Sequence, residues 1–303
     1  MKAMFPDRQR SVRLGDASEP TPEADEAVLA VQAYSVNRGE TLLLEAPRDG
    51  WRPGKDVAGT VTAAAADGSG PPVGARVVAH VPDSGWAERV AAATSTLAVL
   101  PDEVTTETAA ALPLAGLTAL RLLRKAGPLV GRRLLITGAS GGVGHYVTEL
   151  ATAAGAEVTA VSATAERGSR LREFGARTVT DVADAEAWFD VAMESVGGES
   201  FTASRARVRP SGVVIWFGQA SRVPITVDMF DWIDGTVGSR IEPFNYALSD
   251  SSDGADLASL VRLVQLDRLH PEIGSVRPWS QTPQIIDEIR GRVLRGNAVL
   301  AIA

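Results

Sequence analysis

A strand, a glycine turn and a helix follow one another between residues 134 and 151, and this segment limits the possible folds more than any other. Residues 134–136 are an apolar run, residues 138–144 are rich in glycine, and the residues after them carry apolar side chains at helical spacing. A second apolar strand at residues 158–161 completes a unit of about thirty residues. The segment therefore predicts a βαβ unit of the size that binds dinucleotides.

The turn itself matches the glycine fingerprint of such units. The pattern Ala139-x-Gly141-x-x-Gly144 has alanine at the position of the first glycine. Gly141 lets the backbone approach a pyrophosphate, and Gly144 lets the helix pack closely on the strand, while the first N–H groups of the helix attract the phosphates. The residues expected to bind the cofactor here are Ala139, Ser140, Gly141, Gly142, Val143 and Gly144. The alternative interpretation is a tight turn in an ordinary α/β core.

Composition limits the classes of protein to which the chain can belong. With 303 residues, 45% of them hydrophobic, the chain is long enough for about two domains. The net charge of −7 argues against non-specific nucleic-acid binding, and no apolar run reaches membrane-spanning length. The chain has no cysteine and only three histidines, far apart in sequence, so disulfides, thiol catalysis and a Cys- or His-based metal site are not expected. We expect a cytoplasmic protein, since the N-terminus carries no signal-peptide pattern.

The pattern of elements predicts two different sheets. Short strands separated by Gly, Pro and Asp turns fill residues 1–100 and indicate a partly open antiparallel β-barrel. Strands and helices alternate from residue 134 to about residue 241, which is typical of a doubly wound parallel sheet. The last strand, at residues 298–302, falls outside that alternation, so we expect it to return to the first domain. The predicted domains are residues 1–112 with 268–303, and residues 113–267.

Several motifs occur in order along nearly the whole chain. They lie at residues 34–40, 53–59, 112–119, 139–144, 195–198 and 295–300. Together they resemble the medium-chain dehydrogenase/reductase superfamily, and most closely its zinc-independent quinone oxidoreductase branch. The resemblance implies an α/β protein with a GroES-like barrel domain and a Rossmann domain. It also implies a homodimer in which the edge strands of two Rossmann sheets join near residues 236–246.

Within this resemblance, residues 54–56 indicate whether the protein binds zinc and which reaction it catalyses. Zinc alcohol dehydrogenases carry Gly-His-Glu where this chain has Gly54-Lys55-Asp56, so a lysine stands at the histidine ligand position. Without a zinc ion to activate an alcohol, the expected reaction is hydride transfer to an already polarised C=C bond, as in a quinone or an enone. The expected catalytic residues are Asn37, Lys55 and Thr118. Asn37 can bind the nicotinamide ribose or a substrate carbonyl, and Lys55 has a solvated loop lysine as its alternative.

The choice of cofactor depends on the end of the second strand. No acidic residue follows residue 161 directly, whereas NAD sites place one there to bind the ribose 2′-hydroxyl. Ser162 and Arg167 can instead bind a 2′-phosphate, so we expect NADPH, with Arg170 as a weaker candidate. The alternative makes Arg167 a solvated charge. Further expected cofactor contacts follow two later strands or come from the resemblance: Ser195, Val196, Phe217, Gly218, Asn37, Thr118 and Arg292.

Alternatives remain open for the substrate and for the proton donor. The branch often has tyrosines in the cleft at the positions of Leu42 and Arg121, which indicates a specialised small-molecule substrate. An enoyl-thioester reductase and a non-catalytic NADPH-binding protein are the rival functions. Water can supply the proton, and the side-chain candidates are Lys55, Asp56, His80 and Tyr34. Trp51 and Trp86 can stack on a flat substrate, although burial in the core is the usual place for tryptophan.

Overall fold

The computed structural model describes residues 1–185, 188–228, 230 and 238–302. It divides into two compact units. Unit 1 consists of Met1–Leu117 and Asp250–Ala303, and unit 2 of Thr118–Ser249. Within the described ranges, no helix is both long and apolar enough to cross a bilayer.

Unit 1 is built on a mixed sheet. Its strands are β1 (Lys2–Pro6), β2 (Val12–Asp16), β3 (Glu26–Val36), β4 (Asp56–Ala63), β5 (Arg76–His80), β6 (Arg89–Ala93), β7 (Leu97–Val99), β14 (Ile273–Pro278) and β15 (Asn297–Ala301). Among the described residues, seven strands form one sheet in the order β14-β15-β3-β4-β5-β7, with β6 paired to β3. All its pairs are antiparallel except β14–β15. The long strand β3 pairs with three neighbours, so it holds this sheet together.

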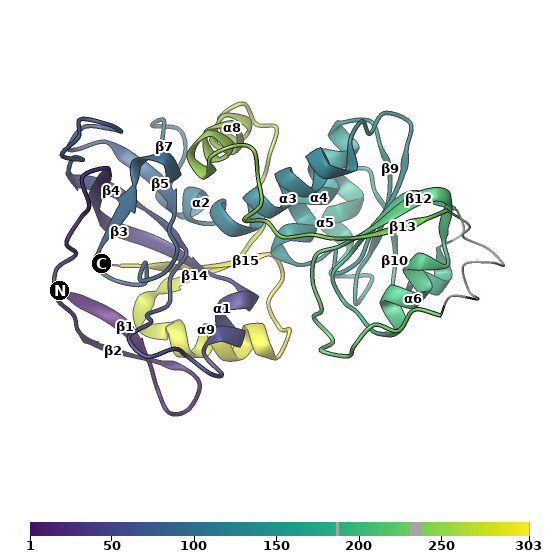
Figure 1. Ribbon diagram of the computed structural model, residues 1–303, viewed down its shortest axis with the longest axis horizontal. Helices are drawn as coiled ribbons and strands as arrows, with labels where there is room; N and C mark the ends of the chain where they lie inside the picture. Colours follow the sequence, from purple (N-terminus) through teal and green to yellow (C-terminus); the bar gives the residue numbers. More distant parts are fainter. Residues whose placement is uncertain (186–187, 229, 231–237, 303) are drawn as a thin grey trace. The chain divides into compact units, whose positions relative to one another are not determined.

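The C-terminal strands lie beside the N-terminal ones in this unit (Figure 1). Strand β15, in yellow, pairs antiparallel with β3, with Leu300 opposite Tyr34. The last strand therefore joins the first domain's sheet, as its position outside the alternation predicts. The helices that complete unit 1 are α1 (Arg38–Leu43), α2 (Thr106–Ala110), α8 (Asp253–Gln265) and α9 (Thr282–Arg290), together with the first turns of α3 (Pro113–Ala126).

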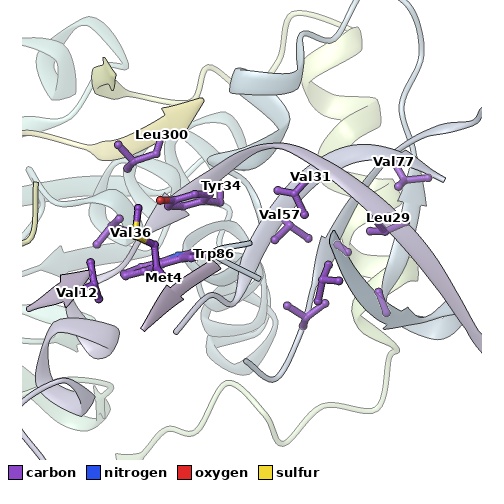
Figure 2. Close-up of a cluster of buried hydrophobic side chains, with 14 of the residues drawn as sticks. Met4, Val12, Leu29, Val31, Tyr34, Val36, Val57, Val77, Trp86 and Leu300 are labelled. Atoms are coloured by element: carbon purple, nitrogen blue, oxygen red, sulfur yellow. The ribbon is translucent and has the colours of Figure 1, made fainter. Parts of the chain in front are cut away.

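The core of unit 1 forms around a pair of stacked aromatic rings. Tyr34 and Trp86 are fully buried, and their ring centroids lie 5.4 Å apart at an interplanar angle of 19°. Figure 2 shows both rings among Met4, Val36 and Leu300. The Tyr34 hydroxyl lies 2.6 Å from Thr282 Oγ1, and the Trp86 indole N–H donates to the Ser35 carbonyl. Both aromatic residues are therefore core residues with satisfied polar atoms.

Unit 2 is a doubly wound parallel sheet. Its strands are β8 (Arg133–Ile136), β9 (Glu157–Val161), β10 (Arg177–Val179), β11 (Phe189–Glu194), β12 (Val208–Trp216) and β13 (Arg240–Pro243), and its helices are the rest of α3, α4 (Gly142–Ala153), α5 (Ser169–Glu173) and α6 (Glu199–Arg205). The order is β10-β9-β8-β11-β12-β13, and every pair is parallel. The chain thus reverses its winding between β8 and β11. Ligands of such sheets bind at this switch point, outside the carboxyl ends of the strands.

The predicted fold class is confirmed, while several element boundaries differ. The sequence predicts a helix over residues 165–174, which forms only at Ser169–Glu173, and the strands expected within residues 1–100 include the hairpin of β1 and β2. The sequence predicts the last parallel strand over residues 236–242, and the structure has it at Arg240–Pro243; residues 238 and 239 are not part of it, and residues 236 and 237 lie outside the described ranges.

The position of α8 also differs from the expected domain boundaries. Residues 253–265 were expected in the second domain, whereas α8 packs on β5 and β7 in unit 1. The buried face of α8 explains this packing, since Leu257, Leu260 and Val261 are almost completely removed from solvent. Sequence spacing shows that a helix has an apolar face, but it does not show which sheet that face will cover.

The close approach of β3 and β4 gives a first prediction. A Cβ atom added at Gly59 would lie 1.9 Å from the Ala30 carbonyl oxygen, whereas nothing in the described structure lies within 4 Å of a Cβ added at Gly39. We expect Gly59→Ala to lower the free energy of unfolding by at least about 2 kcal/mol, because the strands must separate. Gly39→Ala is the matched control and should change it by less than about 1 kcal/mol. Urea denaturation followed by circular dichroism measures both, and equal stabilities would contradict the prediction.

Candidate functional site

The expected site residues of unit 2 gather at the carboxyl ends of four parallel strands. The turn of residues 138–144 follows β8, Ser162 follows β9, Ser195 and Val196 follow β11, and Phe217 and Gly218 follow β12. The Ala139 N–H donates to the Val161 carbonyl at 3.0 Å, and the Phe217 N–H donates to the Glu194 carbonyl at 2.9 Å. Neighbouring strand ends are therefore joined by backbone hydrogen bonds. We call this group of residues the strand-end cluster.

Two glycines of this cluster occupy positions where a Cβ atom would clash with neighbouring atoms. Gly138 has a φ of 61°, and a Cβ added there would lie 2.6 Å from Ser195 Oγ. A Cβ at Gly144 would lie 2.5 Å from Ala139 Cα, which shows how closely the start of α4 approaches the turn. Gly141 is the N-cap of α4 with an extended backbone, so the N–H groups of the next residues begin the helix. These features are the ones that a pyrophosphate-binding turn requires.

A buried carboxylate ties the turn to the neighbouring strand. Glu194 is fully buried at the end of β11. Its Oε1 accepts hydrogen bonds from Thr137 Oγ1 at 3.0 Å, from the Val196 N–H at 3.0 Å and from Ser200 Oγ at 2.9 Å, and its Oε2 accepts from the Gly197 N–H at 3.0 Å. Because Thr137 follows β8 directly, Glu194 joins the two strands on either side of the switch point.

Ser195 strengthens the same connection. Its N–H donates to Thr137 Oγ1 at 2.9 Å, and its hydroxyl donates to the Thr137 carbonyl at 3.1 Å. A Cβ at Gly218 would lie 3.0 Å from the Ser195 carbonyl oxygen, so the end of β12 also packs on this residue. Glu194 and Thr137 were not among the expected site residues. The only sequence signal for Glu194 is an acidic residue that ends an apolar strand just before two glycines.

The residues expected at a 2′-phosphate lie after β9. Ser162 is buried, and its hydroxyl donates to the Thr164 carbonyl at 3.1 Å. The Arg167 N–H donates to Thr164 Oγ1 at 3.2 Å in the turn before α5. Arg170 forms an ion pair with Glu173 at 2.5 Å and lies over the Phe174 ring, 4.9 Å from its centroid. Arg170 is thus held by Glu173 within α5 and by the ring of Phe174, the residue directly after this helix.

The expected site residues of unit 1 surround two buried carboxylates, Glu40 and Asp56. Asn37 is the N-cap of α1, and its N–H donates to Glu40 Oε2 at 3.0 Å, which is half of a capping box. Glu40 Oε1 accepts from the N–H groups of Gly54 at 2.9 Å and of Lys55 at 3.0 Å. The pair Asn37-x-x-Glu40 is a capping-box pattern that the sequence already contains, although its role here was not expected. We call these residues, with Asp56, the carboxylate cluster.

Asp56 collects three donors from three separate segments. Asp56 Oδ2 accepts from Ser35 Oγ at 2.6 Å and from Asn37 Nδ2 at 2.6 Å, and Oδ1 accepts from the Leu114 N–H at 3.0 Å. Leu114 lies in the first turn of α3, where a negative charge is favourable. Asp56 therefore binds β3, the start of α1 and the start of α3 to the first residue of β4.

Burial dominates the acid–base behaviour of these two carboxyl groups. Burial and the nearby Asp56 carboxylate raise the pKa of Glu40 to about 8, against the hydrogen bonds from Asn37 and Gly54, which lower it. Burial also raises the pKa of Asp56, while the charge of His80 and the hydrogen bonds from Asn37, Ser35 and Leu114 lower it. His80 lies opposite Asp56 in the β4–β5 pair, and its Nδ1 is 2.6 Å from Asp253 Oδ2.

The remaining expected residues lie outside the strand-end cluster and the carboxylate cluster. Thr118 lies on α3 as a buried residue at the start of unit 2. Arg292 is exposed after α9 with a φ of 56°, and its N–H donates to the Ile289 carbonyl at 3.1 Å. Of the candidate proton donors, Tyr34 is a core residue whose pKa is raised by burial. Trp51 packs against the hydrophobic core of unit 1, and Trp86 is part of that core.

In the described parts of the chain, no group of three or more His, Asp or Glu side chains is arranged to hold a metal ion. The whole sequence contains no cysteine.

This chain is similar in sequence to one family model and to individual quinone oxidoreductases. A family model described as zinc-binding dehydrogenase matches residues 142–241. The quinone oxidoreductase of Sus scrofa is 28% identical over 95% of this chain and 92% of its own length. The chloroplast envelope quinone oxidoreductase homolog of Arabidopsis thaliana is 35% identical, over 61% of this chain and 60% of its own length.

Solved structures share the fold over the full chain. A mycobacterial protein in complex with NADPH is 25% identical, has a TM-score of 0.88, and covers 99% of this chain and 100% of its own. The Escherichia coli quinone oxidoreductase in complex with NADPH has a TM-score of 0.87 over 99% of this chain and 98% of its own. At 19% identity, the latter similarity concerns the fold alone.

The raised pKa of Glu40 predicts a dependence of stability on pH. The folded state holds a proton on Glu40 up to about pH 8, whereas the unfolded chain releases it near the ordinary value of 4.5. The contribution of Glu40 to stability is therefore complete below the unfolded value and is lost as the pH rises toward 8. We expect wild type to lose up to about 1.4 kcal/mol per pH unit relative to Glu40→Gln in this range.

Urea denaturation at pH 5.5, 6.5 and 7.5 measures this difference. Asp49→Asn serves as the control, because it removes a carboxylate that is exposed. That variant should run parallel to wild type across the series. If Glu40→Gln also runs parallel to wild type, the raised pKa is wrong.

Proposed function

Because the chain belongs to the medium-chain dehydrogenase/reductase superfamily, in its quinone oxidoreductase-like branch, we propose that it is a zinc-independent reductase that transfers a hydride from NADPH to a quinone or an enone. Membership makes the chain a quinone oxidoreductase-like NAD(P)H oxidoreductase. The proposal adds the choice of NADPH, the independence from zinc and the class of acceptor. The strand-end cluster is the observation that carries it.

The strand-end cluster fits a dinucleotide. Two of its glycines allow close approaches that a Cβ would prevent, at Gly138 beside Ser195 and at Gly144 beside Ala139. Residues 139–144 would hold the pyrophosphate against the start of α4, and Ser195, Val196, Phe217 and Gly218 would line the neighbouring strand ends. Ser162 and Arg167 would bind the 2′-phosphate. The mycobacterial and Escherichia coli proteins of this fold were solved in complex with NADPH, which supports NADPH as the cofactor.

The chemistry needs little from the protein beyond positioning. Bound NADPH supplies the hydride, and the acceptor's own carbonyl polarises its C=C bond. The residues of this chain would hold the two reactants in a productive orientation and exclude competing geometries. Asn37, Lys55 and Thr118 are proposed for this role beside the reacting groups. Two of them, Asn37 and Lys55, are held in the carboxylate cluster by Glu40.

Zinc independence is supported by the chemistry of the available donors. A protonated lysine has no lone pair for a metal, and Lys55 stands where zinc alcohol dehydrogenases have a histidine ligand. Cysteine ligands cannot occur, because the chain has none. The family description mentions zinc binding, but it applies to the matched segment of residues 142–241 and not to residues 54–56.

The proposal also covers the partners and the compartment of the protein. Its substrate is a small molecule, it forms a homodimer, and it works in the cytoplasm. Strand β13 is the end strand of the unit 2 sheet among the described residues, and the dimer contact expected near residues 236–246 includes residues 236 and 237, which lie outside them. Neither nucleic acid nor a membrane is proposed as a partner. One relative is named as a chloroplast envelope protein and another as a mitochondrial protein, so the compartment differs among relatives.

The test of the function is NADPH oxidation with a panel of acceptors. Quinones, enones and enoyl thioesters are supplied separately, and the loss of reduced nicotinamide is followed by absorbance. We expect turnover with a quinone or an enone by protein that contains no stoichiometric zinc. Turnover with enoyl thioesters alone would indicate the rival reductase, and tight NADPH binding without turnover would indicate the non-catalytic protein. A zinc ion held by each chain would overturn zinc independence.

The test of cofactor choice compares two arginines on the same segment. Arg167→Ala should weaken NADPH binding at least about tenfold while leaving NADH binding nearly unchanged, because only NADPH carries the 2′-phosphate. Arg170→Ala is the matched control, since Arg170 is held by Glu173 and Phe174. Dissociation constants for both cofactors come from fluorescence titration. Equal weakening of NADPH and NADH by Arg167→Ala would remove Arg167 from the phosphate site.

A further inference from the structure

The loop after β11 uses its hydrogen-bond donors within unit 2. The N–H groups of Val196 and Gly197 donate to Glu194, each at 3.0 Å. The Ser195 N–H donates to Thr137 Oγ1 at 2.9 Å, and the Ser195 hydroxyl donates to the Thr137 carbonyl at 3.1 Å. The donors of residues 195–197 are therefore directed at Glu194 and Thr137, and not at a phosphate.

The direction of the Thr137 hydroxyl follows from these bonds. A backbone N–H can only donate, so Thr137 Oγ1 accepts from Ser195, and its own proton goes to Glu194 Oε1 at 3.0 Å. The Ser200 hydroxyl is a further donor to Glu194, at 2.9 Å. A carboxylate accepts about four hydrogen bonds, and Glu194 receives them from the protein. Glu194, which is fully buried, therefore acts through its neighbours and not on a ligand.

Ser195 packs between two other strand ends of the same sheet. A Cβ added at Gly138, after β8, would lie 2.6 Å from Ser195 Oγ, and a Cβ added at Gly218, after β12, would lie 3.0 Å from the Ser195 carbonyl oxygen. That carbonyl also accepts from the Ala220 N–H at 2.9 Å. Since the contact with Gly138 leaves no room for a methyl group, the position of Ser195 determines the position of Gly138.

Gly138 in turn begins the segment that leads into α4. Its carbonyl accepts from the Gly141 N–H at 3.0 Å, and Gly141 is the N-cap of α4. The first N–H groups of a helix have no partner within it and attract phosphates. A continuous series of contacts therefore runs from Glu194 through Thr137 and Ser195 to the turn before α4.

We propose that Glu194 and Thr137 are positioning residues that form the pyrophosphate site of unit 2 before a dinucleotide binds. This inference rests on the proposed function, in which residues 139–144 hold the pyrophosphate of the cofactor. The loop after β11 sets the position of the turn without donating to the phosphates. Because NADPH and NADH share the pyrophosphate, the two residues affect both cofactors equally, in contrast to Arg167.

The first test replaces the Thr137 hydroxyl. Thr137→Val has a similar shape and lacks the hydroxyl that joins Glu194 to Ser195. It should weaken both NADPH and NADH about tenfold, the equivalent of one hydrogen bond, in fluorescence titrations. Thr137→Ser keeps the hydroxyl and should bind both cofactors within about threefold of wild type. Unchanged binding in Thr137→Val, a loss for NADPH alone, or an equal loss in Thr137→Ser would overturn the inference.

Thr152→Val is the matched control. The Thr152 hydroxyl donates to the carbonyls of Thr148 and Glu149 within α4, away from the turn. Its removal should leave both dissociation constants unchanged, and urea denaturation establishes that each variant is folded under the conditions of the titration. A tenfold loss in Thr152→Val would show that general loosening of unit 2 controls binding, and would overturn the positioning role.

Two further changes address Glu194 itself. Glu194→Gln combined with Thr137→Val should weaken binding by less than the product of the single losses, because both changes break the same hydrogen bond. Losses that multiply would contradict the inference. If either single variant does not fold, Ser200→Ala removes a different donor of Glu194 at a half-buried position and should weaken both cofactors about threefold. Unchanged binding in Ser200→Ala would then overturn the inference.

A measurement without cofactor tests whether the site is formed in advance. In ¹⁵N-labelled protein, the Ser195 N–H should exchange with solvent at least about tenfold faster in Thr137→Val than in wild type, because it loses its acceptor. Equal exchange in the two proteins would overturn the inference. If wild type protects this N–H but binds neither cofactor, the proposed function fails. If wild type binds both cofactors and Thr137→Val binds them equally well, the positioning role alone fails.

Discussion

A carboxylate that is removed from water needs hydrogen-bond donors around it, and each unit of this chain is organised around such a group. In unit 1, Asp56 draws donors from β3, from Asn37 beside α1 and from the start of α3. In unit 2, Glu194 draws them from the end of β8, from the loop after β11 and from the start of α6. Each carboxylate fixes the loops that carry the proposed site residues.

The two carboxylates differ in what they hold in place. Glu194 fixes backbone, because two of its donors are the N–H groups of Val196 and Gly197 in the loop after β11, and this loop borders the glycine turn at Gly138. Asp56 fixes a side chain, because it holds the amide of Asn37 in one direction. A rigid backbone suits the binding of phosphates.

Much of the fold could be predicted from local pattern. The glycine turn, the alternation of strands and helices and the return of the last strand are periodic or compositional features, and the structure has all three. The placement of α8 and the roles of Glu40 and Glu194 could not be predicted in the same way. The apolar face of α8 fits any apolar surface, and Glu194 obtains donors from as far away as Thr137. Such partners become neighbours only when the strands pair.

The sequence by itself determined the class of fold, the turn that can hold a pyrophosphate, and the lack of sulfur ligands for zinc. These properties depend on the kind of residue and on short spacings, which the chain carries before it folds. Only the tertiary structure decided that the Asn37 amide donates to Asp56 and that Tyr34 and Trp86 belong to the core. A hydrogen bond and a stacked ring pair each need two groups in contact, and here the groups are 19 and more residues apart in the chain.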